Sequence, residues 1–169
     1  MNWKLEAQQH AETEQPDESC GLVAIIKGEE KYWPCRNLSK QNFDYFILDP
    51  EDYADCEDQG EIIGLVHSHP HGSANPSDTD KAGCEFSGLE WHIYSLEMKS
   101  WHSFKPSGWT PDNLIGRQWA WGIQDCWSLI CDYYKEKLNI DIKKWPRPKT
   151  IKDFAENPYF EKVLLGSGF

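Results

Sequence analysis

The chain has 169 residues, 39% of them hydrophobic and 14% aromatic, which is enough to build a core and excludes a disordered protein. Its formal net charge of −11 would repel phosphate backbones and anionic lipids, so we expect neither a nucleic-acid nor a membrane partner. No apolar run approaches the length of a membrane span, and the first residues lack the apolar stretch of a secretion signal. We therefore expect a cytosolic protein whose six cysteines are thiols, most of them buried.

The chain begins with one helix signal followed by strand signals. Residues 3–14 are rich in good helix formers, and Pro16 follows soon after the expected end of this helix. Short apolar runs then predict buried strands at residues 20–28, 31–38 and 42–50.

Helix and strand signals continue to alternate after this point. Residues 49–60 start with Asp-Pro, carry an acidic first turn and end at a glycine, which predicts a short helix. The apolar run at 61–69 predicts a strand that leads into a group of histidines, and a helix start is expected within residues 76–84. Residues 89–96 and 99–106 alternate as two closing strands. This order indicates an α/β layer structure.

A connection rich in proline and glycine follows at residues 106–111. Beyond it, residues 122–140 carry apolar side chains at helical spacing. We therefore divide the chain into a first domain at residues 1–105 and a second domain at 106–169.

The histidines at the end of the strand predicted at 61–69 suggest a metal site. Alternate side chains on a strand share a face, so His67 and His69 project together while Ser68 points away. Asp80, at the start of the following helix, can return a carboxylate to the same point. This N,N,O set leaves a fourth position for water, as catalytic zinc sites do, so we predict Zn²⁺ as the cofactor.

The same segments carry a family resemblance. HSHP at residues 67–70, S-x-x-D at 77–80 and PDESCGLV at 16–23 resemble the signature of the JAMM/MPN metallopeptidases, whose members include isopeptidases that remove ubiquitin. The resemblance implies an α/β fold with a mixed sheet flanked by helices. It implies that zinc is bound by His67, His69 and Asp80. It also implies that Ser77 helps to hold the oxyanion and that Glu18 activates the zinc-bound water.

Each part of this pattern also has an ordinary structural explanation. A lone His-x-His pair is more often a polar surface feature than a site. Ser77 could serve only as a helix cap, and Asp80 only as a favourable charge at the helix dipole. His71 is given no role. A zinc deaminase is excluded, because its His-x-Glu and Pro-Cys-x-x-Cys motifs are absent from the chain.

The segment WGIQDCWSLICDYY at residues 121–134 resembles the nucleophile segment of NlpC-like cysteine peptidases, in which an Asp-Cys pair opens a helix. The resemblance implies a partial papain-like helical segment with Cys126 as its nucleophile, and a helix N-terminus favours a thiolate. The alternative is that Cys126 is a small core residue. That family needs a histidine after the cysteine, and the last histidine here is His102. We therefore expect Cys126 to contribute nothing to catalysis.

A JAMM module followed by an NlpC-like segment resembles the phage tail-tip assembly protein K family. This resemblance implies a zinc peptidase or isopeptidase of the tail tip, acting on a peptide bond in host peptidoglycan or in a tail protein. It implies other tail-tip proteins as partners, and a location in the host cytoplasm during assembly and at the tail tip of the virion. The alternative function is an assembly factor that uses the fold as an interaction surface. A cellular deubiquitinase fits less well, because a cell-wall-type module has no place in it.

Overall fold

The computed structural model describes residues 2–39, 45–111, 114–117, 119, 124–143 and 145. Contacts within the chain group it into two compact units. The first consists of residues 1–77 and 87–107, and the second of residues 78–86 and 108–169. None of the helices in the described part is both long and apolar enough to cross a membrane.

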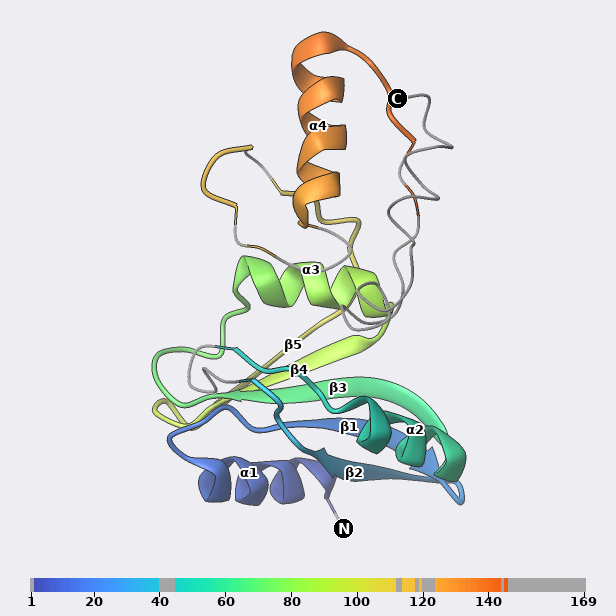
Figure 1. Ribbon diagram of the computed structural model, residues 1–169. Helices are drawn as coiled ribbons and strands as arrows, with labels where there is room; N and C mark the ends of the chain where they lie inside the picture. Colours follow the sequence, from blue (N-terminus) through green and yellow to red (C-terminus); the bar gives the residue numbers. More distant parts are fainter. Residues whose placement is uncertain are drawn as a thin grey trace. The chain divides into compact units, whose positions relative to one another are not determined.

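The first unit is built on a five-stranded mixed sheet (Figure 1). Its strands are β1 (Cys20–Ile26), β2 (Glu29–Cys35), β3 (Glu61–His69), β4 (Glu90–Ser95) and β5 (Ser100–Phe104). They lie in the order β2-β1-β3-β4-β5, and only the β3 and β4 neighbours run parallel. A parallel pair needs a long crossover, and helix α3 (Asp78–Ser87) lies in the connection between these two strands. The expected mixed α/β sheet is therefore confirmed.

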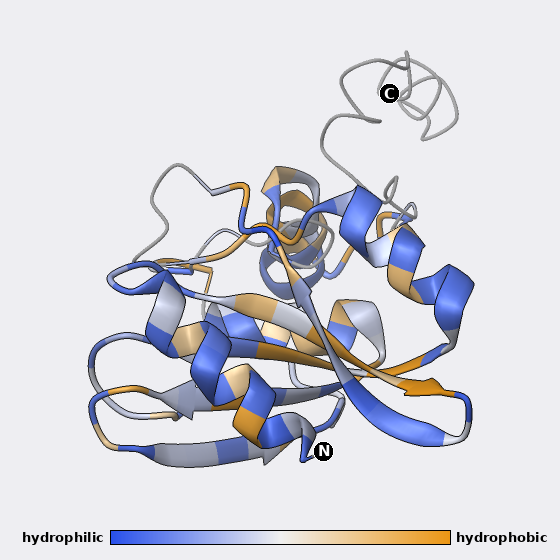
Figure 2. Cartoon of the chain, turned by 90° about the horizontal axis from the view of Figure 1, so that it is seen from below, coloured by the Kyte–Doolittle hydropathy of each residue, from blue (hydrophilic) through white to orange (hydrophobic). Residues whose placement is uncertain are grey.

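Two helices cover opposite faces of this sheet, α1 (Trp3–Glu14) and α2 (Pro50–Gln59). On β1, Leu22 belongs to a core cluster with Cys56 of α2, whereas the next residue, Val23, packs with Ala7 of α1. Neighbouring residues of a strand point to opposite faces, so one strand contributes to both cores. Both helices are largely hydrophilic, while the middle of the sheet is hydrophobic (Figure 2).

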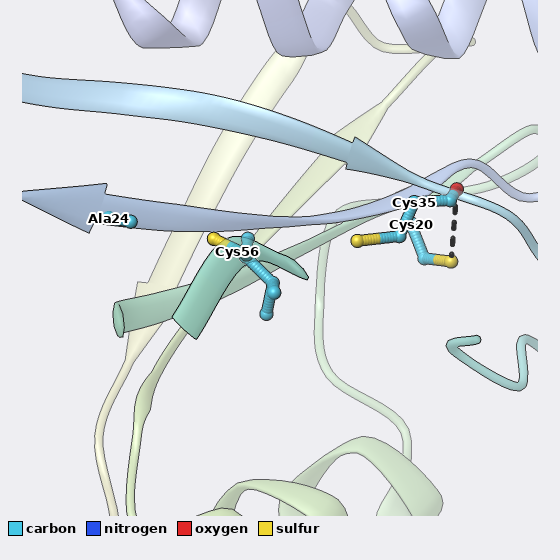
Figure 3. Close-up of a cluster of buried hydrophobic side chains, with 5 residues drawn as sticks. Cys20, Ala24, Cys35 and Cys56 are labelled. Carbon is cyan, nitrogen blue, oxygen red and sulfur yellow. Dashed lines mark hydrogen bonds between the residues drawn. The ribbon is translucent and has the colours of Figure 1, made fainter. Parts of the chain in front are cut away.

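The α2 face of the core is rich in thiols. Cys20, Cys35 and Cys56 lie together with Ala24 in one buried cluster, and the Cys20 thiol donates to the backbone oxygen of Cys35 (Figure 3). All six cysteines are free thiols, and five of them are buried. This confirms the expectation of thiols that are mostly buried.

Most of the predicted elements of the first unit are confirmed, but the strand predicted at residues 42–50 is wrong. Residues 42–44 lie outside the described part of the chain, and residues 45–49 form no strand. The Asn37 side-chain oxygen accepts hydrogen bonds from the backbone N–H groups of Ser39 and Ile47, at 2.9 and 3.0 Å. A polar side chain thus takes donors that a strand ladder would use, and only an isolated bridge joins Asn37 to Leu48.

The glycine at position 21 of β1 allows the neighbouring strand β2 to pack closely against it. A Cβ atom on Gly21 would lie 2.6 Å from the backbone oxygen of Trp33 and would also clash with the hydroxyl of Tyr32. That hydroxyl is held by the Nδ1 atom of His10 at 2.8 Å. The space is therefore closed by backbone on one side and by a bonded side chain on the other.

We expect Gly21→Ala to lower the free energy of unfolding by about 1–3 kcal/mol, as overpacking of a closed site typically does. Urea denaturation of both proteins measures this difference. In a Tyr32→Phe background the same substitution should cost less, because the hydroxyl is gone while the Trp33 carbonyl and the ring carbon at 2.6 Å remain. An unfolding midpoint that Gly21→Ala leaves unchanged would contradict this account of the packing.

The second unit contains helix α4 (Cys126–Leu138), which lies within the helix predicted at residues 122–140. The carboxylate of Asp125 accepts a hydrogen bond from the backbone N–H of Ser128 at 2.9 Å, which caps the N-terminus. Asn139 ends the helix in a left-handed conformation. The apolar side chains of Leu129, Ile130 and Tyr133 on this helix are exposed.

Residues of α3 are tied to the second unit by contacts with Trp109. The backbone N–H of Trp109 donates to the carboxylate of Glu85 at 2.9 Å. The Lys81 ammonium lies 5.8 Å from the centroid of the Trp109 ring, a cation–π contact. These contacts explain why residues 78–86 group with the second unit.

Candidate metal centre

The two predicted histidine ligands meet at the end of β3. Their Nε2 atoms lie 3.2 Å apart, and His67 is 1% exposed. In a tetrahedral zinc site with Zn–N bonds of about 2.0–2.1 Å, two ligand nitrogens lie about 3.3–3.4 Å apart. The observed separation is therefore close to that of two imidazoles sharing one ion.

A carboxylate joins them from the first turn of α3. Ligand atoms of His67, His69 and Asp80 all lie within 4.8 Å of one another. Asp80 is only 7% exposed, and a buried carboxylate is costly unless it is paired with a cation or hydrogen-bonded. The structure thus brings together the three residues that the sequence predicted as ligands.

The second nitrogen of His69 is hydrogen-bonded to the loop that follows. Its Nδ1 atom lies 2.8 Å from the backbone oxygen of Ser73, which can only accept, so Nδ1 carries the proton. In a neutral His69 imidazole, the Nε2 atom then has the lone pair that a metal ligand needs. A carbonyl that fixes the ligand tautomer in this way is a regular feature of zinc sites.

The turn between β4 and β5 holds the loop after His69. The backbone N–H of Leu96 donates to the His69 oxygen at 3.0 Å. The Ser95 hydroxyl donates to the Gly72 oxygen at 2.6 Å, and the Gly72 N–H donates to the carboxylate of Glu97 at 2.7 Å. Because these contacts are made to backbone groups, they fix the path of the loop independently of its side chains.

Aromatic rings enclose the imidazole of His67. The Phe46 ring centroid lies 4.8 Å from it, and the Trp91 ring meets it edge-on at 5.6 Å. Rings on two sides limit the rotation of the imidazole and keep water from its faces. Sequence reasoning did not single out either aromatic residue. Trp91 shares the face of His67 through the register of β3 and β4, but Phe46 reaches it from a segment without strand structure.

The predicted base, Glu18, precedes β1 and is 6% exposed. Cys20 pairs with His67, and the backbone N–H of Ser68 donates to the Ser19 oxygen at 3.0 Å, so the pairing continues beyond Cys20. Glu18 directly precedes this contact, so its backbone lies next to the strand end that carries the histidines. The Asn37 amide donates to the Glu18 backbone oxygen at 3.0 Å.

A thiol also faces the site across the sheet, since Cys20 is the register partner of His67. Burial raises the pKa of the Cys20 thiol to about 12, and the carboxylates of Asp52 and Glu18 add to this. The thiol donates to the backbone oxygens of Cys35 and Arg36, at 3.7 and 3.6 Å, and belongs to the buried cluster shared with α2. Cys20 is therefore a packing residue of the core, beside the candidate ligands.

The remaining two predicted site residues lie next to helix starts. Ser77 is exposed and directly precedes α3, three residues before Asp80. Cys126 is the first residue of α4 and is exposed, so the interpretation of this thiol as a core residue is wrong. All six histidines of the chain belong to the first unit, whereas Cys126 belongs to the second. The oxyanion role of Ser77 and the inertness of Cys126 stay predictions.

Comparison with known proteins agrees with this geometry. Residues 2–105 match the family of prokaryotic homologs of the JAB domain. The tail tip assembly protein K of Escherichia phage N15 is 41% identical over 133 residues, which cover 79% of this chain and 54% of that protein. Its namesake of Escherichia phage lambda is 36% identical over 87 residues, 52% of this chain and 41% of that protein. The chain thus spans about half the length of these relatives, or less.

A solved structure is also similar, the solution structure of protein DSY2949 from Desulfitobacterium hafniense. It is 28% identical, with a TM-score of 0.50 over 60% of this chain and 76% of that one. The family match includes Glu18, both histidines and Asp80, and the five-stranded sheet holds the histidines at one strand end. The chain therefore belongs to the prokaryotic homologs of the JAB domain and is a homologue of tail tip assembly protein K.

Proposed function

We propose that this protein is a zinc-dependent peptidase or isopeptidase of a phage tail tip. The observation that carries the proposal is the convergence of His67, His69 and Asp80 within 4.8 Å. Glu18 is buried and lies two residues before β1, the strand that pairs with the strand of the histidines. Two imidazoles and one carboxylate match the protein ligand set of catalytic zinc sites that keep one position for water.

The chemistry follows from the residue types. When bound, zinc lowers the pKa of its water to about 7 and polarises the scissile carbonyl. The Glu18 carboxylate accepts a proton from the attacking water and returns it to the leaving nitrogen. The Ser77 hydroxyl donates a hydrogen bond to the developing oxyanion, a contribution typically worth about 3 kcal/mol. Zinc and Ser77 would thus stabilise charge on the carbonyl oxygen, while Glu18 would carry the proton from the water to the leaving nitrogen.

The proposed substrate is a peptide or isopeptide bond in host peptidoglycan or in another tail protein. The homology to tail tip assembly protein K supports a tail-tip setting, with tail proteins as partners. We also propose a domain division at residue 105, an NlpC-like segment after it, and action in the host cytoplasm or at the tail tip. The division at 105 coincides with the end of the family match.

A second candidate function is that of an assembly factor without hydrolysis. The exposed apolar side chains Leu129, Ile130 and Tyr133 on α4 favour it, because contiguous apolar surface is typical of protein contacts. The two functions differ in whether they depend on bound zinc. An assembly factor should still join other tail proteins after the zinc has been removed, whereas a peptidase should lose its effect.

The experiment measures the zinc content of the purified protein and then its action on purified sacculi and on co-expressed tail proteins. We expect one zinc per chain, and release of peptides that stops with a chelator and returns when zinc is added. A protein that binds no zinc, or releases peptides equally well with chelator, would overturn the peptidase proposal.

Cysteine chemistry is expected to contribute nothing to this activity. A helix N-terminus alone activates a thiol only weakly, and all six histidines of the sequence belong to the first unit, whereas Cys126 belongs to the second. Cys126→Ser should therefore hydrolyse the same substrates at the wild-type rate, as measured by peptide release. Activity that survives zinc removal but disappears in Cys126→Ser would mean that the thiol obtains a base from His92, His102 or a partner chain.

A further inference from the structure

Two buried serines join the strand that carries the histidine ligands to the residue after Glu18. The backbone N–H of Ser68 donates to the Ser19 oxygen at 3.0 Å. In a regular antiparallel pair the N–H of Ser19 would return this bond to the backbone oxygen of Ser68. Here the N–H of Ser19 donates to the hydroxyl oxygen of Ser68 at 2.9 Å, and the Ser19 hydroxyl donates to the same oxygen at 3.1 Å.

This contact links the residue after Glu18 to the residue between the two histidines. Ser68 stands between His67 and His69, and its hydroxyl receives the peptide N–H that directly follows Glu18. A side-chain acceptor in place of a backbone acceptor alters how closely the Glu18–Ser19 peptide lies to β3. The hydroxyl thereby sets the distance between the base and the ligand-bearing strand end.

Water cannot easily replace this contact. Ser19 is 3% exposed and Ser68 is 1% exposed. Removal of the Ser68 hydroxyl leaves the buried Ser19 N–H to find another acceptor, and the nearest regular one is the Ser68 backbone oxygen. That exchange would pull the Glu18–Ser19 peptide into the regular ladder and change the aim of the Glu18 side chain.

The other side of Glu18 is fixed by the Asn37 amide, which donates to its backbone oxygen at 3.0 Å. Asn37 is itself held, because its side-chain oxygen accepts from the N–H groups of Ser39 and Ile47. The peptide before Ser19 thus has one fixed partner on the β2 side and another on the β3 side. Of the two, only the Ser68 contact connects the base to the metal ligands.

We propose that Ser68 is a positioning residue, whose hydroxyl holds Glu18 in place relative to His67 and His69. This inference rests on the proposed function, because it assigns to Glu18 the role of base. It assigns no contact between Ser68 and substrate or metal, since the Ser68 side chain points away from the face that carries the histidines.

The test compares Ser68→Ala, Ser68→Thr and Glu18→Gln with the wild-type protein. Zinc affinity is measured by competition with a chelating dye, and hydrolysis by peptide release from sacculi. The pH at which the visible spectrum of the cobalt-loaded protein changes is a readout that needs no substrate. A neighbouring carboxylate raises that pH by charge repulsion, so its loss or displacement lowers it.

We expect Ser68→Ala to keep the wild-type zinc affinity, to lower hydrolysis by about 10²-fold, and to lower the spectral midpoint in the direction of Glu18→Gln. Ser68→Thr keeps the hydroxyl acceptor, so its hydrolysis rate and spectral midpoint should stay close to those of the wild type. A merely structural role would lower the melting temperature without moving the spectral midpoint. If Ser68→Ala does not fold, Ser68→Cys, which keeps the volume and only a weak acceptor, replaces it.

The possible outcomes distinguish the role of Glu18 as base from the role of Ser68 in positioning it. If Glu18→Gln changes neither hydrolysis nor the cobalt spectrum, the role of Glu18 as base is wrong and the inference falls with it. If Glu18→Gln acts but Ser68→Ala behaves like the wild type, the proposed function stands and the positioning role of Ser68 is wrong. Loss of zinc in Ser68→Ala would also overturn it, because the serine would then support the ligands and not the base.

Discussion

Glu18→Gln should keep its zinc and its fold but lose hydrolysis by about 10²–10⁴-fold, the usual contribution of a general acid–base group. The amide fills the space of the carboxylate but cannot accept the proton of the attacking water. Glu18 is buried and directly precedes Ser19, which is hydrogen-bonded to Ser68 between the two histidines. Glutamine has nearly the shape of glutamate, so the change removes one proton acceptor and little packing. Zinc analysis, thermal unfolding and peptide release from sacculi measure the three parts of this expectation.

The matched control is Glu29→Gln, which removes a carboxylate from an exposed position at the start of β2. It should leave zinc content, melting temperature and hydrolysis unchanged. A Glu18→Gln protein that loses its metal would show that Glu18 is a ligand and not a base. Full activity in that variant would remove Glu18 from the reaction altogether.

Asp80→Ala should lose most of its zinc affinity, because it removes the only carboxylate of the three-residue ligand set. A metal that binds only the folded state stabilises it by about 2.7 kcal/mol when its concentration is a hundred times the dissociation constant. Metal-free wild-type protein should therefore melt at a higher temperature after zinc is added, and Asp80→Ala should not. Thermal unfolding at neutral pH with and without zinc measures both effects.

Asp78 offers a close control, because it lies in the same first turn of α3 but is exposed and pairs with Lys81. Asp78→Ala should bind zinc as the wild type does, which separates loss of a ligand from loss of negative charge at the helix start. If added zinc does not change the melting temperature of the metal-free wild type, the site itself is refuted.

The site could be predicted from sequence where its residues depend on local geometry. His67 and His69 share a face because strand side chains alternate, and the strand at 61–69 was predicted with its observed ends. The capping Asp49 and the glycine after α2 likewise mark a helix by local chemistry alone. These parts need no knowledge of what lies on the neighbouring strand.

The parts that sequence reasoning missed depend on pairing between distant segments. The serine contact exists only because Cys20 pairs with His67, and no local pattern fixes such a register. Phe46 contacts His67 from a segment whose apolar pattern suggests a strand. In that segment the backbone N–H of Ile47 donates to the side chain of Asn37 instead of to a strand neighbour. Such side-chain hydrogen bonds compete with strand ladders, and no local apolar pattern reveals them.

The exposed thiol of Cys126 offers a single site for coupling a chemical label to this chain. Cys126 is exposed while the other five cysteines are buried, and burial slows the reaction of a thiol with alkylating reagents. A maleimide dye or a gold cluster should therefore couple to one known residue of the unmodified sequence. Such a conjugate, supplied during phage assembly, would reveal by fluorescence or electron microscopy whether the protein stays on finished particles.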